Sequence, residues 1–331
     1  MQISDLRVEV RARLLDFAWD QWAQMGVSAA GRRADHWAVD PEALLLFTFE
    51  VARADARLFD EVLDWLAHNE RLVSVQRLRN LCRDETDRAL ADACLAWASR
   101  STDRERPGTR PKIVEAPPML PLFRELNADA RRADRAFAAH GWLKPPTERS
   151  GKSQGPDLFA PINFAFRLRS VLGVGARAEV ARFLLTVFAP NATAQVVTES
   201  AAYAKRNVHE ALTLLNSAGV ISGVTAGNEQ RYSIDRDGWA MLLGLSGDGF
   251  PAARSWPQLL HALRRLVRWL EDEQHENLSP YMLASEARAL AEEILPELRY
   301  AGVRVPFAAR RGAEYWQDFI DLVHAALAAL A

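Results

Sequence analysis

Polar side chains that can bind nucleic acid are concentrated in two short stretches of the chain. Five lie close together and one follows further on: Lys205, Arg206, Asn207, His209, Thr213 and Arg231. The planar guanidinium of an arginine can donate two hydrogen bonds to guanine, and an asparagine amide pairs in the same way with adenine. Lysine and exposed arginine also contact phosphate oxygens through their charge. These residue types predict contacts with the bases and backbone of DNA, provided that the fold presents them together.

The apolar residues between these side chains predict the element that carries most of them. Four of them recur at the spacing of one helix face: Val208, Ala211, Leu212 and Leu215. We therefore expect a helix that buries this face, ends at Gly219 and turns its polar residues outward. Two helices are expected before it. The first begins near residue 176 and is closed by Ala189-Pro190-Asn191, and the second runs from about Thr193 to Ala202.

After Gly219 the hydrophobic period changes from that of a helix to that of a strand. Strands are expected over residues 220–225 and 230–234, with Ala226-Gly227-Asn228 as the turn between them. The predicted order is therefore three helices followed by a β-hairpin. In DNA-binding proteins with this order, the third helix enters the major groove and the hairpin lies against the flanking backbone.

With this order of elements, the stretch resembles the winged helix-turn-helix domains of bacterial transcription regulators, of the arsenic-repressor-like and multiple-antibiotic-resistance-regulator-like types. The resemblance covers residues 164–245 and rests on an apolar template, its turn and the hairpin: Val197, Ala201, Val208, Leu212, Leu215, Gly219, Val220, Ile221 and Gly227 to Tyr232. It implies a regulator that binds double-stranded DNA as a homodimer and reads a pseudo-palindromic site with its third helix. Arg206 and Asn207 would then contact base edges, and Lys205 and Arg231 would contact phosphate.

The charge of this region leaves other functions open. Between Phe164 and Leu245 there are eight basic and six acidic residues, a small excess for a surface that binds DNA. Glu210 lies on the polar face of the third helix, Glu229 lies in the hairpin, and the fold decides whether Arg167 and Arg169 extend the basic surface. One alternative is a winged helix that binds a protein, as an antitoxin-like or scaffolding partner. Another is a regulator whose N-terminal helical domain senses a ligand.

Composition narrows the class of protein. The chain has 331 residues, of which 49% are hydrophobic and 25% charged, so it can bury a core of more than one domain. Its net charge of −2 excludes a polycationic surface. Two cysteines are too few for a disulfide scaffold, and the apolar runs are too short to span a bilayer. We therefore expect a mostly α-helical, cytoplasmic protein with no membrane partner.

The chain divides into four predicted parts. An N-terminal helical domain over 1–100 contains a helix from Pro41 to about Arg53, with Asp40 as its N-cap. Residues 101–163 are predicted to form a linker, a helix from about Leu122 to His140 that stops at Gly141, and a flexible surface loop over 144–161. The winged helix over 164–245 follows. The C-terminal helical region over 250–331 is expected to support dimerisation through an apolar stripe: Trp316, Phe319, Ile320, Val323 and Leu327.

No pattern typical of an enzyme stands out. The seven histidines lack the spacing of a helical zinc site, and no catalytic residues, metal ligands or cofactor site are predicted. Gly151-Lys152-Ser153 lacks the upstream glycine and strand of a phosphate-binding loop. Most of the ten tryptophans lie on apolar stripes, and the basic residues Arg264, Arg265 and Arg268 are placed opposite one such stripe. We expect the tryptophans to pack in the core.

Overall fold

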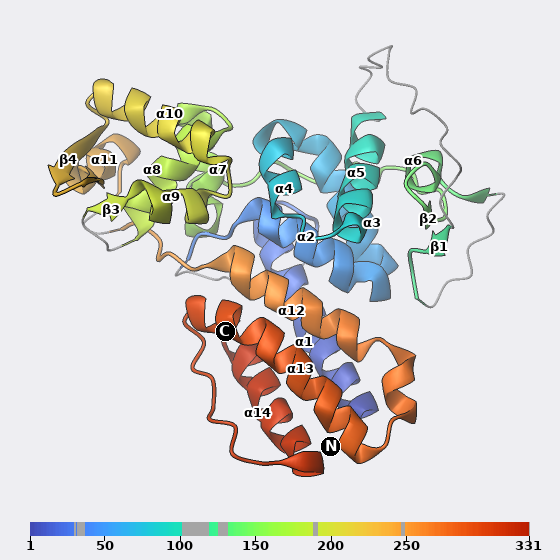
Figure 1. The fold of residues 1–331 in the computed structure, drawn as a ribbon. Coiled ribbons are helices and arrows are strands. Elements are labelled where there is room, and N and C mark those ends of the chain that lie inside the picture. Colours follow the sequence, from blue (N-terminus) through green and yellow to red (C-terminus); the bar gives the residue numbers. More distant parts are fainter. Residues whose placement is uncertain are drawn as a thin grey trace.

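The computed structural model describes residues 1–29, 31, 37–100, 119–124, 132–187, 191–245 and 249–330. These residues form fourteen α-helices and five short strands, which confirms the mostly helical prediction (Figure 1). In these ranges, no helix combines the length and the apolar character needed to cross a bilayer. The predicted linker lies mostly in 101–118, outside the described residues.

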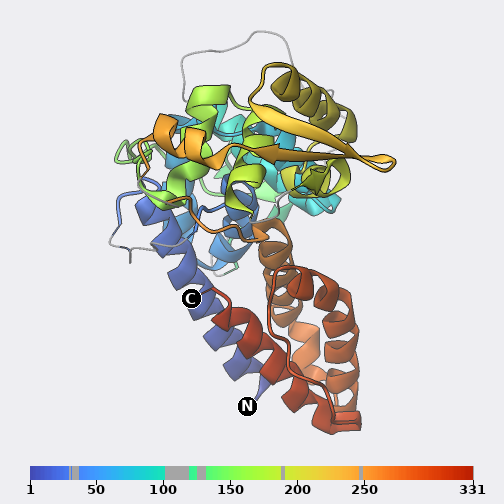
Figure 2. The same cartoon turned by 90° about the vertical axis from the view of Figure 1, so that its left-hand side faces the viewer.

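Helices from both ends of the chain build one large body. It contains α1 (Ile3–Gln24), α2 (Pro41–Val51), α3 (Ala56–His68), α4 (Val75–Leu81), α5 (Glu85–Arg100), α12 (Trp256–Leu270), α13 (Pro280–Tyr300) and α14 (Tyr315–Ala328). One continuous hydrophobic core runs through it, with residues from Ile3 to Leu330. Helix α12 packs on α2, and α14 lies along α1 (Figures 1 and 2). Segments that are far apart in sequence thus share one core.

The helix predicted from Pro41 is the centre of this body. The carboxylate of Asp40 caps α2 by accepting a hydrogen bond from the Ala43 N–H at 3.1 Å, as predicted. All eleven residues of α2 are buried, including Glu42 and Glu50. The helix ends at Val51, slightly before the predicted Arg53, and a single 3₁₀ turn follows. A carboxylate buried in this way requires a cation beside it.

The apolar stripes of α12 and α14 are largely buried, but two features of these helices differ from the prediction. Four residues of the predicted stripe, Phe319, Ile320, Val323 and Leu327, lie in the core of the same chain, and Trp316 is half-buried beside them, so most of this stripe is closed to a second copy. The predicted dimer surface is therefore wrong. Arg264 is also buried and forms an ion pair with Asp87 of α5, because it faces α5 from α12 and not the solvent.

Between α5 and residue 164 the structure differs from the prediction. Leu122 to Arg124 are not helical, because Leu122 donates its N–H to the Leu143 carbonyl and Arg124 to the Arg53 carbonyl. Two short strands, β1 (Leu120–Pro121) and β2 (Trp142–Leu143), pair in parallel, and the described helix is only α6 (Arg135–Ala138). Residues 125–131 lie outside the described ranges. Gly141 does adopt the positive φ, 80°, that ends the helix.

The segment predicted as a flexible surface loop is held against α3. Lys144 is fully buried, with its ammonium 2.7 Å from Asp60. The carboxylate of Asp64 accepts hydrogen bonds from the N–H groups of Gly151 and Ser153. The loop therefore covers one side of the helical body, and Gly151-Lys152-Ser153 encloses a carboxylate of the protein itself.

The remaining elements form a second part at one side of the body. They are α7 (Phe164–Leu172), α8 (Ala176–Thr186), β3 (Ala192–Thr193), α9 (Ala194–Ala201), α10 (Lys205–Ser217), β4 (Ile221–Ala226), β5 (Glu229–Ile234) and α11 (Arg236–Leu243). Strands β4 and β5 form the antiparallel hairpin at the predicted place. The two-residue β3 pairs with the outer side of β5, which the sequence did not predict. Ala189-Pro190 lies outside the described residues.

This second part has a core of its own. Val197, Val208, Leu212 and Leu215 of α9 and α10 are buried against Tyr232 of β5. A further apolar cluster lies between α7, α8 and α11. The apolar template of α10 therefore faces inward, as its spacing predicted, and the polar side chains between these positions are left at the surface.

Candidate nucleic-acid interface

The exposed face of α10 brings together most of the predicted DNA-binding residues. Lys205, Arg206, His209 and Thr213 are exposed, and Asn207 is half-buried at the edge of the face. Ala204, the residue before the helix, has no side chain that could cap it. The first N–H groups of α10 are therefore free of a side-chain cap, as a helix end that meets an anion requires.

Arg206 is not free on this face. Its Nε donates a hydrogen bond to Oε1 of Glu210 at 2.9 Å, one turn later, while the two side chains remain 87% and 58% exposed. This hydrogen bond raises the pKa of Arg206. An exposed pair of this kind is weak, so a stronger acceptor can displace the carboxylate.

Together these residues line a shallow hollow. Its volume is about 700 Å³, and its walls are Lys205, Arg206, His209, Glu210, Thr213 and Leu214. The hydroxyl of Thr213 donates to the His209 carbonyl at 2.9 Å, so it faces a ligand mainly as an acceptor. Leu214 adds an exposed apolar side chain to the wall. The hollow thus offers two cations, one anion and an apolar side.

The hairpin carries the remaining predicted residue. Arg231 is exposed on β5, between Val224 of β4 and Thr193 of β3. Figure 2 shows the hairpin projecting beyond the helices, where a flat or convex partner can reach it. Glu229 lies at the turn of the same hairpin, opposite Ala226, and places a negative charge near its tip.

Two arginines that could have extended the basic surface do not do so. Arg169 is buried, and its guanidinium donates to Glu42, Glu179 and the Leu72 carbonyl. Arg167 donates to the carbonyl at residue 243, and its guanidinium lies 4.8 Å from the ring centre of Phe159. Arg167 and Arg169 therefore add nothing to the basic surface that α10 and the hairpin expose.

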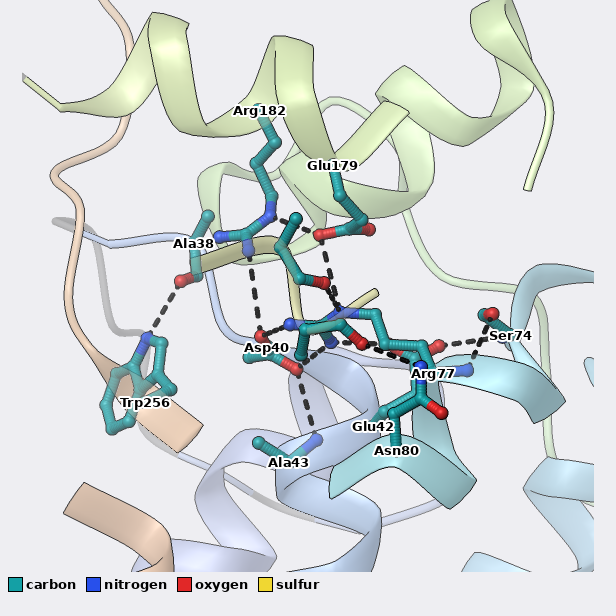
Figure 3. Close-up of polar contacts among 12 residues, drawn as sticks. Ala38, Asp40, Glu42, Ala43, Ser74, Arg77, Asn80, Glu179, Arg182 and Trp256 are labelled. Atoms are coloured by element: carbon teal, nitrogen blue, oxygen red, sulfur yellow. Dashed lines mark hydrogen bonds and ion pairs between the residues drawn. The ribbon is translucent and has the colours of Figure 1, made fainter. Parts of the chain in front are cut away.

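A buried charge network, part of which is drawn in Figure 3, joins the second part to the body. Arg169 belongs to this network through its pairs with Glu42 and Glu179. The members of the network are three acids and three arginines from α7, α8, α4 and the start of α2: Asp40, Glu42, Arg77, Arg169, Glu179 and Arg182. Arg77 binds Asp40 through both terminal nitrogens, each at 2.5 Å. Arg169 binds Glu42 in the same bidentate way, each contact being 2.7 Å.

The network favours the ionised form of Glu179 and of Asp40. Burial alone would raise the pKa of Glu179, but the charges of Arg182, Arg169 and Arg77 lower it well below its ordinary value. Burial likewise opposes ionisation of Asp40, and Arg77 more than compensates, so the Asp40 pKa is lowered. With equal numbers of each charge, the network is neutral as a whole.

The same network holds the turn that precedes α10. The Nε of Arg77 donates to the Ala201 carbonyl at 2.8 Å, and Asn80 donates to the Ala202 carbonyl at 3.1 Å. The Tyr203 hydroxyl donates to Ser74 Oγ at 2.6 Å. Ala202 itself has a left-handed backbone, with φ of 55°, which is uncommon for alanine. Helix α4 therefore fixes where α10 begins.

Sequence reasoning found the exposed side chains of this site and missed the buried ones. Asp40 was predicted only as a helix cap. A signal was present in α2, where Glu42 and Glu50 interrupt an otherwise apolar helix and so require cations. It could not identify Arg77 or Arg169 as those cations, since both lie far along the chain.

Comparison with known protein families, with curated proteins and with solved structures gave no match to this chain. Function is therefore inferred from the side chains that α10 and the hairpin expose. The buried network fixes the turn before α10 and so determines how these side chains are held.

Proposed function

We propose that residues 164–245 form a winged helix-turn-helix domain that binds double-stranded DNA. The observation that supports this is the polar face of α10, exposed beside a projecting hairpin in the order helix, helix, helix, hairpin. In this arrangement α10 enters the major groove and the hairpin follows the backbone. Because the stripe expected to join two copies is buried, the proposal concerns one chain on one half-site.

The side chains divide into those that read sequence and those that hold the duplex. Arg206 and Asn207 are near the start of α10, where they reach base edges. Lys205 and the free N–H groups of α10 contact phosphate, as does Arg231 from the hairpin. Glu210 repels phosphate and holds Arg206 by one hydrogen bond, so Arg206 leaves it where a guanine edge offers two acceptors at once. Glu210 thereby opposes binding to unrelated DNA.

The two arginines are expected to respond differently to truncation. Arg206→Ala should cost about 1–3 kcal/mol on the best site and flatten the preference among sites. Arg231→Ala should weaken all sequences alike and reduce the salt slope by about one. The measurement is selection from random duplexes followed by titrations at several salt concentrations. Arg13→Ala removes an exposed charge from α1 and serves as the control, which should change neither property.

Glu210→Gln should have the opposite effect on unrelated DNA. The variant removes a negative charge from the face of α10 and weakens the hold on Arg206, so affinity for a scrambled duplex is expected to rise by about threefold to tenfold. Affinity for the selected site should rise less, so the ratio of the affinity for the selected site to that for the scrambled duplex should decrease. Equal weakening on both duplexes would show that Glu210 supports binding and would contradict this role.

A protein partner is the second candidate function. It is favoured by the hollow on α10, where the Arg206–Glu210 pair leaves little net charge and Leu214 is exposed. The experiments separate the two candidates. If neither Arg206→Ala nor Arg231→Ala changes binding to genomic fragments at low salt, while either one disrupts a complex with a co-purified protein, the DNA proposal is wrong.

A further inference from the structure

A second exposed basic segment lies between α13 and α14. Residues 299–312, RYAGVRVPFAARRG, contain four arginines and no acidic residue, in a chain whose net charge is −2. Residues 303–311 are neither helical nor part of a strand. We call residues 303–311 the strap. Phe307, in the middle of the strap, is 90% exposed.

The strap is fixed at both ends. Val303 is buried and donates its N–H to the Leu298 carbonyl at 2.9 Å. At the other end, Arg310 donates from its backbone N–H and from its guanidinium to Asp318, at 2.7 and 2.6 Å. In the described parts of the chain, the backbone N–H groups of residues 304, 305 and 307–309 have no hydrogen-bond partner. The middle of the strap is thus held in place and open to a ligand.

Three exposed aromatic rings lie on the strap or near its ends. It runs back along α13 from the end of that helix, where Tyr300 is 53% exposed, toward its start, where Tyr281 is 68% exposed (Figures 1 and 2). The ring of Tyr281 lies beside Gly312, 3.9 Å from where a Cβ on that glycine would be. Helix α13 has 21 residues and is therefore about 30 Å long. Phe307 lies on the strap between the two tyrosines.

The arginines of this segment are largely uncompensated. Arg299, Arg304 and Arg311 are exposed, and within the described ranges no carboxylate pairs with them. Arg310 does have partners, since it binds Asp318 and Asp321. Exposed rings and unpaired arginines therefore alternate along the same line.

We propose that the strap binds single-stranded nucleic acid. Bases stack on Phe307 and on the flanking tyrosines, while Arg304 and Arg311 contact phosphates between them. A duplex keeps its bases stacked internally and cannot offer them to Phe307. A bilayer surface favours one continuous apolar face beside a basic one, whereas here rings and charges are interleaved. The strap is separate from α10, so the inference does not depend on the proposed function.

Fluorescence anisotropy with labelled oligothymidylate and oligouridylate of about 20 nucleotides tests the inference on the full chain at low salt. The protein should bind both, Phe307→Ala should weaken binding about fivefold or more, and Phe307→Trp should retain it. Arg304→Ala should reduce the salt slope by about 0.7. Phe159→Ala removes another exposed phenylalanine, outside the strap, and should leave affinity unchanged. Because the Phe307 side chain is 90% exposed, its variants are expected to fold normally.

Three results would overturn the inference. The first is that the wild-type protein binds neither oligonucleotide, or that Phe307→Ala binds them as well as the wild type does. The second is that Arg206→Ala abolishes this binding, which would place the single strand on α10. The third is that vesicles of phosphatidylcholine and phosphatidylserine bind in a Phe307-dependent way while the oligonucleotides do not, which would make the strap a membrane contact. If Arg231→Ala loses duplex binding but still binds the single-stranded oligonucleotides, the strap acts independently of α10 and the hairpin.

Discussion

Replacing Arg77 by alanine is expected to destabilise the folded chain by about 3–5 kcal/mol, because the substitution breaks a buried set of ion pairs from one side only. The guanidinium of Arg77 binds Asp40 and Glu42 in a region without solvent access. Its loss would leave both carboxylates buried with one cation fewer, and the Ala201 carbonyl without its donor. Without Arg77, Asp40 would have to take up a proton, or the chain would have to unfold and return the carboxylate to water.

Urea unfolding at neutral pH measures this effect. The control is Arg79→Ala, which lies two residues away on α4 and removes an exposed pair with Asp92. An exposed pair contributes about 0–1 kcal/mol, so the two variants should differ severalfold. Equal, small changes in both variants would show that water reaches the network and that its charges do not depend on one another.

Acid is expected to unfold the protein through its buried, ion-paired carboxylates. Burial opposes ionisation of Glu179, Asp40, Glu50 and Asp87, yet neighbouring arginines lower the pKa of each below its ordinary value. A carboxylate whose folded pKa is lowered stabilises the fold above its unfolded pKa. That stability is lost as the pH falls through the range between the two values. Unfolding free energy should therefore be level near neutral pH and decrease by several kcal/mol below about pH 5.

Urea midpoints at a series of pH values check this expectation. Glu179→Gln is the informative variant, because three arginines hold the pKa of Glu179 well below its ordinary value. It should be less stable at neutral pH and should lose less stability on acidification. A wild-type midpoint that stays constant down to about pH 3 would contradict the assignment of these carboxylates as ionised in the folded state.

Local pattern was sufficient to predict α10 and the hairpin. The positions of Val208, Leu212 and Leu215 determine both that α10 is a helix and which side is buried, because side-chain direction repeats with the turn of the helix. Gly219 and Gly227 mark the ends of the following elements in the same local way. For this reason the exposed residues of the candidate site could be predicted from the sequence. The hydrogen bond between Arg206 and Glu210 depends on the side-chain conformations, which the structure supplies.

Long-range pairing was beyond such reasoning. The stripe on α14 predicts a buried face, but periodicity does not distinguish a face covered by α1 and α13 from one covered by a second copy. Arg169 looks like a surface arginine in sequence, since the acids that bury it come from α2 and α8. The helix predicted to begin at Leu122 was wrong for a similar reason, because the backbone of this segment forms hydrogen bonds with the distant residues Leu143 and Arg53.

The shared core of the body sets an order of events on the ribosome. Helix α2 is buried all round in the finished protein, and its neighbour α12 is about two hundred residues further on, so at about 5–20 residues per second α2 waits some tens of seconds for its partner. During that time the nascent chain exposes an apolar helix to chaperones and to other chains. Residues 164–245 have their own core and can fold within this interval. The first part of the polypeptide to be made is thus among the last to reach its native packing.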